Sequence, residues 1–90
     1  MITQKDIDSI DHKYFQVIEC NGSCVCLKSL NTKHYWCIVS SGISLEHKYF
    51  KLYHKHHYED QFHFQKNIGN FKSAIYEIKK HDEFQLGGRK

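Results

Sequence analysis

The sequence predicts an α+β domain: an antiparallel sheet of four or five strands, an amphipathic C-terminal helix packed on one face, and a short N-terminal helix. Two patterns predict this class. Short β-rich segments alternate with turn residues from position 14 to position 65, and apolar residues at helical spacing follow from position 71. A chain of 90 residues that is 40% hydrophobic suits one domain with its own core, so we expect residues 1–90 to form a single domain.

A capping box predicts the first element, a short helix within residues 1–10. Thr3 and Asp6 have the spacing at which each side chain accepts a hydrogen bond from the backbone amide of the other. The box satisfies amides that the first turn of a helix otherwise leaves without partners.

A β-hairpin is expected next, with strands over 14–19 and 23–30. Asn21 and Gly22 separate the strands and favour a type I′ turn, in which both central residues have positive φ. The resulting pairs are Cys20 with Ser23, Glu19 with Cys24, Ile18 with Val25 and Val17 with Cys26. One face would then carry Ile18, Cys20, Val25 and Leu27. The opposite face would carry Phe15, Val17, Cys24 and Cys26.

Three further strands are expected. Residues 34–39 form the third, because they are rich in β-branched and aromatic side chains. The fourth runs from Leu45 or Tyr49 to His54, and the fifth covers 62–65. These last two strands are close enough in sequence to form a second hairpin.

The C-terminal helix has the most regular pattern. Asn70 is a favourable N-cap residue at its start. The apolar positions that should face the sheet are Phe71, Ala74, Ile75 and Ile78. The positions that should face water are Lys72, Glu77, Lys79 and Lys80. We expect the helix to end within 81–84, and residues 86–90 to be a frayed tail.

Composition limits the functional classes. The net charge of +3 is compatible with a polyanionic partner, but Arg89 is the only arginine, so bidentate guanidinium reading of bases or phosphates is not expected. The first ten residues lack a signal-peptide pattern, and the apolar runs are far shorter than the ~20 residues that span a bilayer. We therefore expect a cytoplasmic protein with free thiols and no membrane partner.

Residues 49–57 contain the candidate contact surface. In an extended strand, alternate side chains share a face. One face would be the core side, with Phe50, Leu52, His54 and His56. The other would be exposed, with Tyr49, Lys51, Tyr53, Lys55 and His57, and with Tyr35 or Trp36 as a neighbour. Alternating tyrosines and cations suit single-stranded nucleic acid, and they suit a protein partner or a plain exposed strand as well.

Four histidines between positions 54 and 63 raise the question of a metal. If Phe62 and Phe64 point into the core, His63 points outward, and only His57 shares its face. Two ligands do not make a structural zinc site, so His57 and His63 remain candidates without a third ligand, and we expect no metal and no other cofactor.

The cysteines also argue against a metal site. The predicted register puts Cys20 on the face opposite Cys24 and Cys26, and no C-x-x-C pair is present. We therefore interpret the cysteines, including Cys37, as small hydrophobic residues.

No catalytic activity is expected. His34 and Cys37 have an odd spacing on the third strand, which puts a base and a nucleophile on opposite faces. No glycine-rich phosphate loop, zinc-protease helix or serine-nucleophile motif occurs. In size, lysine-rich composition and lack of a catalytic motif, the chain resembles small accessory proteins of phages and mobile elements, including anti-CRISPR-like inhibitors. This is a resemblance of class that no particular residue carries.

The expected function is a non-catalytic binding module that occupies a nucleic acid or nucleoprotein surface, as an inhibitor of a host nucleic-acid-directed system would. The alternative is a protein-only interaction module or a homodimer, formed through the second sheet face or an unpaired strand edge. A third hypothesis is a histidine–metal protein or a metal-dependent nuclease.

Overall fold

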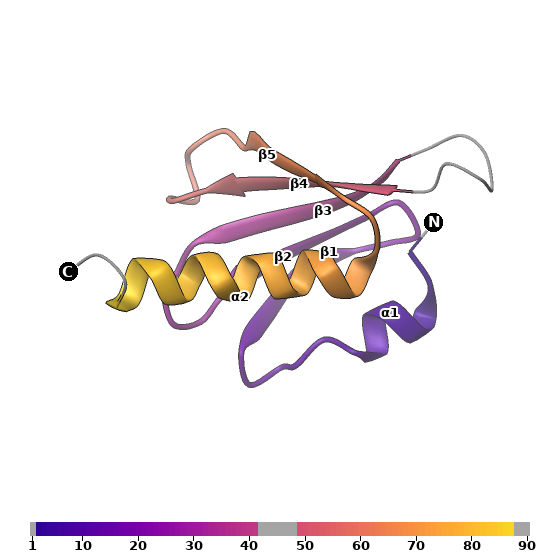
Figure 1. The fold of residues 1–90 in the computed structure, drawn as a ribbon, viewed down its shortest axis with the longest axis horizontal. Coiled ribbons are helices and arrows are strands. Elements are labelled where there is room, and N and C mark those ends of the chain that lie inside the picture. The colour runs from indigo at the N-terminus through magenta and orange to yellow at the C-terminus, as the bar shows by residue number, and fades with distance from the viewer. Residues whose placement is uncertain (1, 42–48, 88–90) are drawn as a thin grey trace.

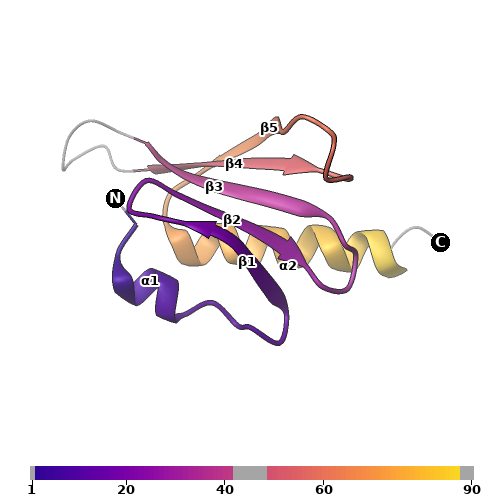
Figure 2. The ribbon, with the colours of Figure 1, turned by 180° about the vertical axis from the view of Figure 1, so that it is seen from behind.

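The computed structural model describes residues 2–41 and 49–87 and has the predicted α+β architecture (Figure 1). Its elements are α1 (Gln4–Asp8), β1 (Phe15–Cys20), β2 (Cys24–Ser29), β3 (Tyr35–Ser41), β4 (Tyr49–Lys55), β5 (His63–Ile68) and α2 (Phe71–Gly87). The five strands form one antiparallel sheet in the order β1-β2-β3-β4-β5, so each strand pairs with its neighbour in sequence. Figures 1 and 2 show α2 along one face of this sheet and neither described helix over the opposite face.

The core lies between the sheet and α2. The sheet contributes Phe15, Val25, Leu27, Trp36, Ile38, Phe50, Leu52 and Ile68, all nearly or fully buried. The helix contributes Phe71, Ala74 and Ile78. Removing this apolar surface from water is the main force that holds the two layers together. Of the described helices, none is both long and apolar enough to cross a membrane.

The capping box of α1 is confirmed. The Asp6 backbone amide donates to the Thr3 Oγ1 atom at 3.1 Å, and the Thr3 amide donates to Asp6 Oδ2 at 3.1 Å. Ile2 and Ile10 flank the helix and are buried in the core, so they fix this short element to the rest of the fold.

The first hairpin has the predicted strands but a different turn. The Asn21 backbone amide donates to the Cys24 carbonyl at 2.9 Å, which leaves Gly22 and Ser23 as the central turn residues. The Asn21 side chain accepts hydrogen bonds from the amides of Ser23 at 2.8 Å and Cys24 at 3.0 Å. Among the described non-glycine residues, only Lys33 has a positive φ, so the predicted type I′ turn at Asn21 is wrong. Asparagine here acts through its side chain.

This turn shifts the register of the hairpin. Val17 pairs with Leu27 rather than with Cys26, and a bulge follows before Glu19 pairs with Cys26. A shift of one residue exchanges the two faces of a strand. Phe15 and Val17 therefore pack on the core side with Leu27, whereas Ile18, which was predicted to share a face with Leu27, is 44% exposed.

The remaining strands occupy the predicted positions with small changes. β4 and β5 form the second hairpin, and β5 extends three residues beyond the predicted end at position 65. The alternative start of the fourth strand at Leu45 lies outside the described residues.

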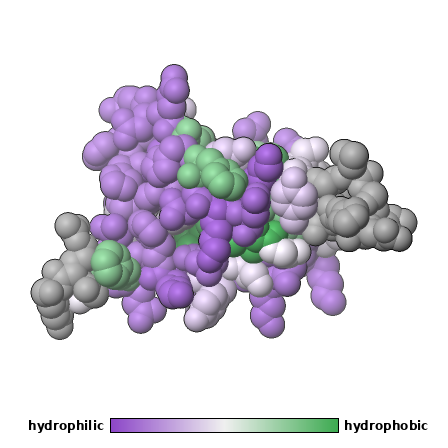
Figure 3. Space-filling model, turned by 45° about the horizontal axis from the view of Figure 1, so that its top comes forward, coloured by the Kyte–Doolittle hydropathy of each residue, from purple (hydrophilic) through white to green (hydrophobic). Residues whose placement is uncertain are grey.

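The edge of the sheet at β5 is polar. Five of its six residues are exposed, and only Ile68 is buried. Lys66 forms an ion pair with Glu77 of α2 at 3.2 Å. Figure 3 shows that the side of the molecule on which β5 lies is mainly hydrophilic. Charged side chains on an edge strand discourage pairing with another chain.

The cap of α2 is confirmed, and the helix is longer than predicted. Asn70 Oδ1 accepts a hydrogen bond from the Ser73 amide at 2.8 Å. The helix continues past 81–84 to Gly87, so the predicted fraying of residues 86 and 87 is wrong. Asp82 explains the extension, because its carboxylate is buried and anchors the last turns to the sheet side of the molecule.

Replacing Asn70 with alanine is expected to lower the free energy of unfolding by about 1 kcal/mol, because the Ser73 amide loses its acceptor. Urea denaturation followed by circular dichroism measures the loss. Lys72→Ala changes an exposed residue in the same helical turn and should change stability by less than about 0.5 kcal/mol. Equal losses in the two variants would contradict a stabilising cap.

Candidate functional site: the outer sheet face and two side-chain clusters

The predicted alternation along β4 is confirmed. Phe50, Leu52 and His54 are buried on the core side, and the residues between them are half-buried on the face turned away from α2. We call that face the outer face. Its aromatic and basic residues are Lys28, Tyr35, Tyr49, Lys51, Tyr53, Lys55 and Phe64.

Tyr35 is at the centre of a row of basic residues on the outer face. It pairs with Lys28 of β2 and Lys55 of β4, and their Nζ atoms lie 5.5 Å and 5.4 Å from its ring centroid. The Lys55 Nζ atom is also 5.1 Å from the Tyr58 ring and 4.6 Å from the Phe62 ring. It donates a hydrogen bond to the Tyr58 carbonyl at 2.8 Å. Aromatic rings therefore hold Lys55 in place by cation–π attraction.

Trp36 does not belong to the outer face, contrary to the prediction. It is fully buried and pairs with Leu27 and His54 on the core side. Its ring stacks on the His54 ring at 4.1 Å. Since Tyr35 and Trp36 are adjacent in one strand, only one of them can face outward.

The positions of Phe64 and His63 reverse the prediction. Phe64 pairs with Tyr53 on the outer face, with ring centroids 5.8 Å apart, and is 52% exposed. His63 pairs with His54 and turns toward the core side, although its own side chain is exposed. The assumption that Phe64 points inward was wrong, because Phe64 pairs with the outer-face residue Tyr53 and therefore shares its face.

His57 lies in the loop after β4 rather than on the strand. β4 ends at Lys55, and the His57 amide donates to the Asp60 carboxylate at 3.2 Å in the following turn. The centroid of its ring is 6.5 Å from that of the His56 ring, whereas the His63 ring lies beside the His54 ring. The predicted pairing of His57 with His63 on one face is therefore not formed.

A histidine cluster lies instead at the end of the sheet near the C-terminal part of α2. Its members are His34, His54, His56, His63 and His81, and His54 is in ring contact with all the others at 4.8–5.4 Å. His54 Nε2 and His34 Nδ1 are 3.1 Å apart, a hydrogen bond. His34 and His81 were not among the predicted site residues, because they come from the turn before β3 and from α2.

Burial lowers the pKa values of three histidines in this cluster. Burial, reinforced by repulsion from the neighbouring histidines, lowers the pKa of His54 to about 3. The pKa values of His34 and His81 are also lowered, again mainly by burial. Burial therefore favours the uncharged form of these three imidazoles.

The ring geometry of the histidine cluster does not favour metal binding. The ligand atoms of His34, His54 and His56 lie within 4.8 Å of one another. However, the centroids of the stacked His34 and His56 rings are 4.4 Å apart with an interplanar angle of 16°, so their lone pairs lie in two nearly parallel planes and do not converge between the rings. The hydrogen bond to His54 also uses a His34 nitrogen. Stacking and hydrogen bonding explain this cluster without an ion.

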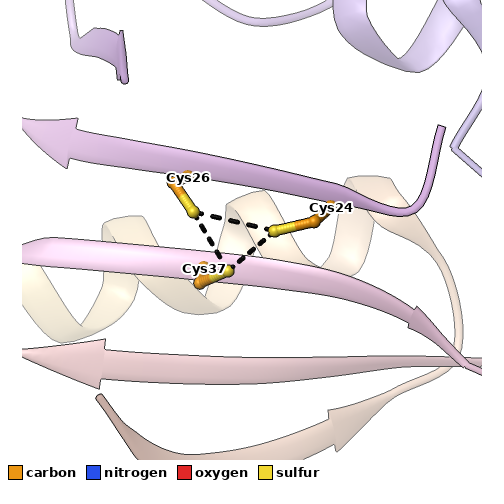
Figure 4. Close-up of side chains that lie close together, drawn as sticks. All are labelled: Cys24, Cys26 and Cys37. Carbon is orange, nitrogen blue, oxygen red and sulfur yellow. Dashed lines mark hydrogen bonds between the residues drawn. The ribbon is translucent and has the colours of Figure 1, made fainter. Parts of the chain in front are cut away.

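Three cysteines converge on the outer face between β2 and β3 (Figure 4). The Sγ atom of Cys37 is 3.0 Å from that of Cys24 and 3.2 Å from that of Cys26, and the last two are 3.6 Å apart. Burial raises the pKa of Cys26 to about 11 and also raises that of Cys37. The sequence placed Cys24 and Cys26 together, but the position of Cys37 depends on the β2–β3 register, which no motif indicates.

Comparison of the chain with protein-family models, with curated proteins and with solved structures gives no match. The fold and the side-chain geometry are therefore the basis for a functional assignment.

Proposed function

We propose that the protein is a non-catalytic binding module whose outer face binds single-stranded nucleic acid, free or within a nucleoprotein complex. The observation that carries this proposal is the row formed by Lys28, Tyr35 and Lys55 across three strands, on a sheet face that neither described helix covers. An inhibitor of a nucleic-acid-directed system would act by occupying such a partner surface.

The chemistry of the outer face suits a single strand better than a duplex. Aromatic rings offer surfaces on which bases stack, at about 1–3 kcal/mol per base, and any base has such a face. Tyr53 and Phe64 form a second aromatic site, adjacent to the row. Lysines neutralise phosphates as point charges and need no fixed geometry, whereas reading duplex base edges commonly relies on arginine.

Lys51 and Lys55 contribute differently to this surface. Lys55 is held by three rings and by the Tyr58 carbonyl, so its charge is positioned before a ligand arrives. Lys51 is half-buried and pairs with Val39 and Asn67, which are uncharged. Positioned cations lose less side-chain entropy on binding than mobile ones.

A salt titration tests the proposal. We expect a labelled oligothymidylate or oligouridylate to bind with an affinity that falls as salt rises, because phosphate contacts release counterions. Lys51→Gln combined with Lys55→Gln should reduce the magnitude of the log–log slope by about 1.4, since each contact with a single strand contributes about 0.7. Fluorescence anisotropy measures both quantities.

Lys5→Gln combined with Lys72→Gln is the matched control, because it removes the same charge from the two helices. Its slope should stay close to that of the unaltered protein. Equal slopes for the two double variants would show that net charge alone attracts the oligonucleotide. Salt-independent binding, or none, would exclude the nucleic-acid proposal.

The homodimer alternative has its own observation. Tyr53 and the 52%-exposed Phe64 form an aromatic pair on the outer face, where a second copy of the chain could pack. Light scattering distinguishes the two proposals, since a strict monomer excludes the homodimer. A dimer that Phe64→Ser dissociates would instead favour it.

A further inference from the structure

The three clustered thiols come together through pairing of two neighbouring strands. Cys26 of β2 and Cys37 of β3 are direct partners in the register, and Cys24 lies two residues before Cys26 on the same face. Figure 4 shows their sulfur atoms turned toward one another, with α2 passing behind the strands. All three side chains are free thiols.

We propose that Cys24, Cys26 and Cys37 form a binding site for one thiophilic metal ion, monovalent copper. Each sulfur lies within 3.6 Å of the other two, so three donors already point to a common centre. Thiolates are soft ligands and favour soft cations of this class. This inference does not rest on nucleic-acid binding, although the site lies on the same outer face and beside Lys28.

The number of ligands favours copper over zinc. Structural zinc sites almost always have four protein ligands in a tetrahedron. Within the described residues, no histidine or carboxylate atom joins the three sulfurs at comparable distances. Monovalent copper tolerates trigonal coordination, for which three thiolates suffice.

The site requires only a small rearrangement to receive the ion. Metal–sulfur bonds of about 2.3 Å in a trigonal plane put the sulfurs roughly 4 Å apart. The observed separations of 3.0–3.6 Å are shorter, so the side chains must spread by about 1 Å or less. Cys24 and Cys26 are only half-buried, which leaves room for this rotation and a path for the ion. Each thiol that binds releases its proton to solvent.

Lys28 provides favourable charge beside the site. It follows Cys26 by two residues on the same strand and therefore shares the outer face. Three thiolates and one monovalent cation carry a net charge of −2, and a neighbouring ammonium group reduces its cost. Glu19, the partner of Cys26 on β1, acts in the opposite direction.

The test is an anaerobic titration of the reduced full chain with monovalent copper against a chromophoric copper chelator. We expect one tightly bound ion per chain. Cys24→Ser and Cys26→Ser should each weaken binding at least tenfold, because each removes one of three ligands. X-ray absorption should show three sulfur neighbours around the copper.

Cys20→Ser is the matched control, since Cys20 is exposed. It pairs with Val25, which lies on the face of β2 opposite to the three clustered cysteines. This substitution should leave the affinity unchanged. Circular dichroism establishes that each variant folds, and the half-buried positions 24 and 26 avoid the risk of altering buried Cys37.

Three results would overturn the proposal. Binding that Cys20→Ser weakens as much as Cys24→Ser would indicate non-specific thiol chemistry. One zinc ion per chain that excess monovalent copper does not displace would contradict the choice of metal. The protein could also be purified with a Cys26–Cys37 disulfide that, once reduced, forms again in air. If the reduced protein then takes up no copper, the pair belongs to redox chemistry.

Discussion

Replacing Asp82 with alanine is expected to lower the free energy of unfolding by about 2–4 kcal/mol. The Asp82 carboxylate is fully buried and accepts hydrogen bonds from the Tyr14 hydroxyl at 2.8 Å and from Thr32 Oγ1 at 3.0 Å. It therefore joins α2 to the segment before β1 and to the turn between β2 and β3. Alanine would leave both donors without this acceptor, and an unsatisfied buried group costs about 1–3 kcal/mol.

Chemical denaturation isolates this effect when Asp82→Ala is compared with Glu83→Ala, with Tyr14→Phe and with the Tyr14→Phe/Asp82→Ala double variant. Glu83→Ala removes the same charge from the next, exposed position and should change stability by less than about 0.5 kcal/mol. Tyr14→Phe removes one donor, so its effect should be much smaller in the Asp82→Ala background than in the unaltered protein. Additive effects of the two substitutions would contradict the hydrogen bond. Burial raises the pKa of Tyr14 to about 12, so its hydroxyl keeps its proton and remains a donor at neutral and acidic pH.

Periodicity and end signals were sufficient to predict the elements. The capping box at Thr3 and Asp6 and the N-cap at Asn70 both form as predicted, because these hydrogen bonds are local in sequence. The alternation along β4 also holds, since a strand must turn successive side chains to opposite faces. The end of α2 was not predictable, because Asp82 stabilises it through residues 50 and 68 positions away.

Register could not be predicted in the same way. Asn21 suits two turn geometries that differ by one residue, and the structure has the one in which its side chain accepts the amide hydrogen bonds. The pairing of β5 with β4 likewise depends on a seven-residue loop, over 56–62, that has no standard turn signal. His63 and Phe64 were placed on the wrong sides because Phe64 was assumed to point into the core, whereas the β4–β5 pairing puts it beside Tyr53 on the outer face.

The two side-chain clusters could not be predicted for the same reason, because both depend on how distant elements are aligned. Cys37 joins Cys24 and Cys26 only when β2 and β3 are aligned, and His81 joins His54 only when α2 is packed on the sheet. Neither relation has a sequence spacing that a motif would describe. By contrast, Tyr53 and Lys55 belong to one strand, so the basic and aromatic part of the outer face was predictable.

Acid is expected to destabilise this protein through His54. The folded-state pKa of His54 is about 3, below the ordinary value of ~6.5 that it should have in the unfolded chain. Between these values the unfolded chain binds a proton that the folded protein does not, so stability falls as the pH falls. The contribution of uncharged His54 to the free energy of unfolding is fully present above pH ~6.5 and declines as the pH falls toward ~3. From pH 7.5 to 5, His54 alone should account for about 2 kcal/mol.

Its neighbours act in the same direction. His34, His56, His63 and His81 surround the His54 ring, and a charge on any of them opposes its protonation. The pKa values of His34 and His81 are themselves lowered, so they should steepen the decline over the same range. Asp82 opposes this effect, because its negative charge favours protonation of His34 and His81.

His54→Gln separates this contribution from general acid unfolding. A glutamine amide can occupy the position of Nε2 and keep a hydrogen bond to His34, but it does not titrate in this range. Urea midpoints measured at several pH values between 7.5 and 5 should therefore depend less on pH in this variant. His12→Gln changes an exposed histidine and should retain the full dependence. If the two variants lose stability equally as the pH falls, His54 is protonated in the folded state and the cluster is open to water.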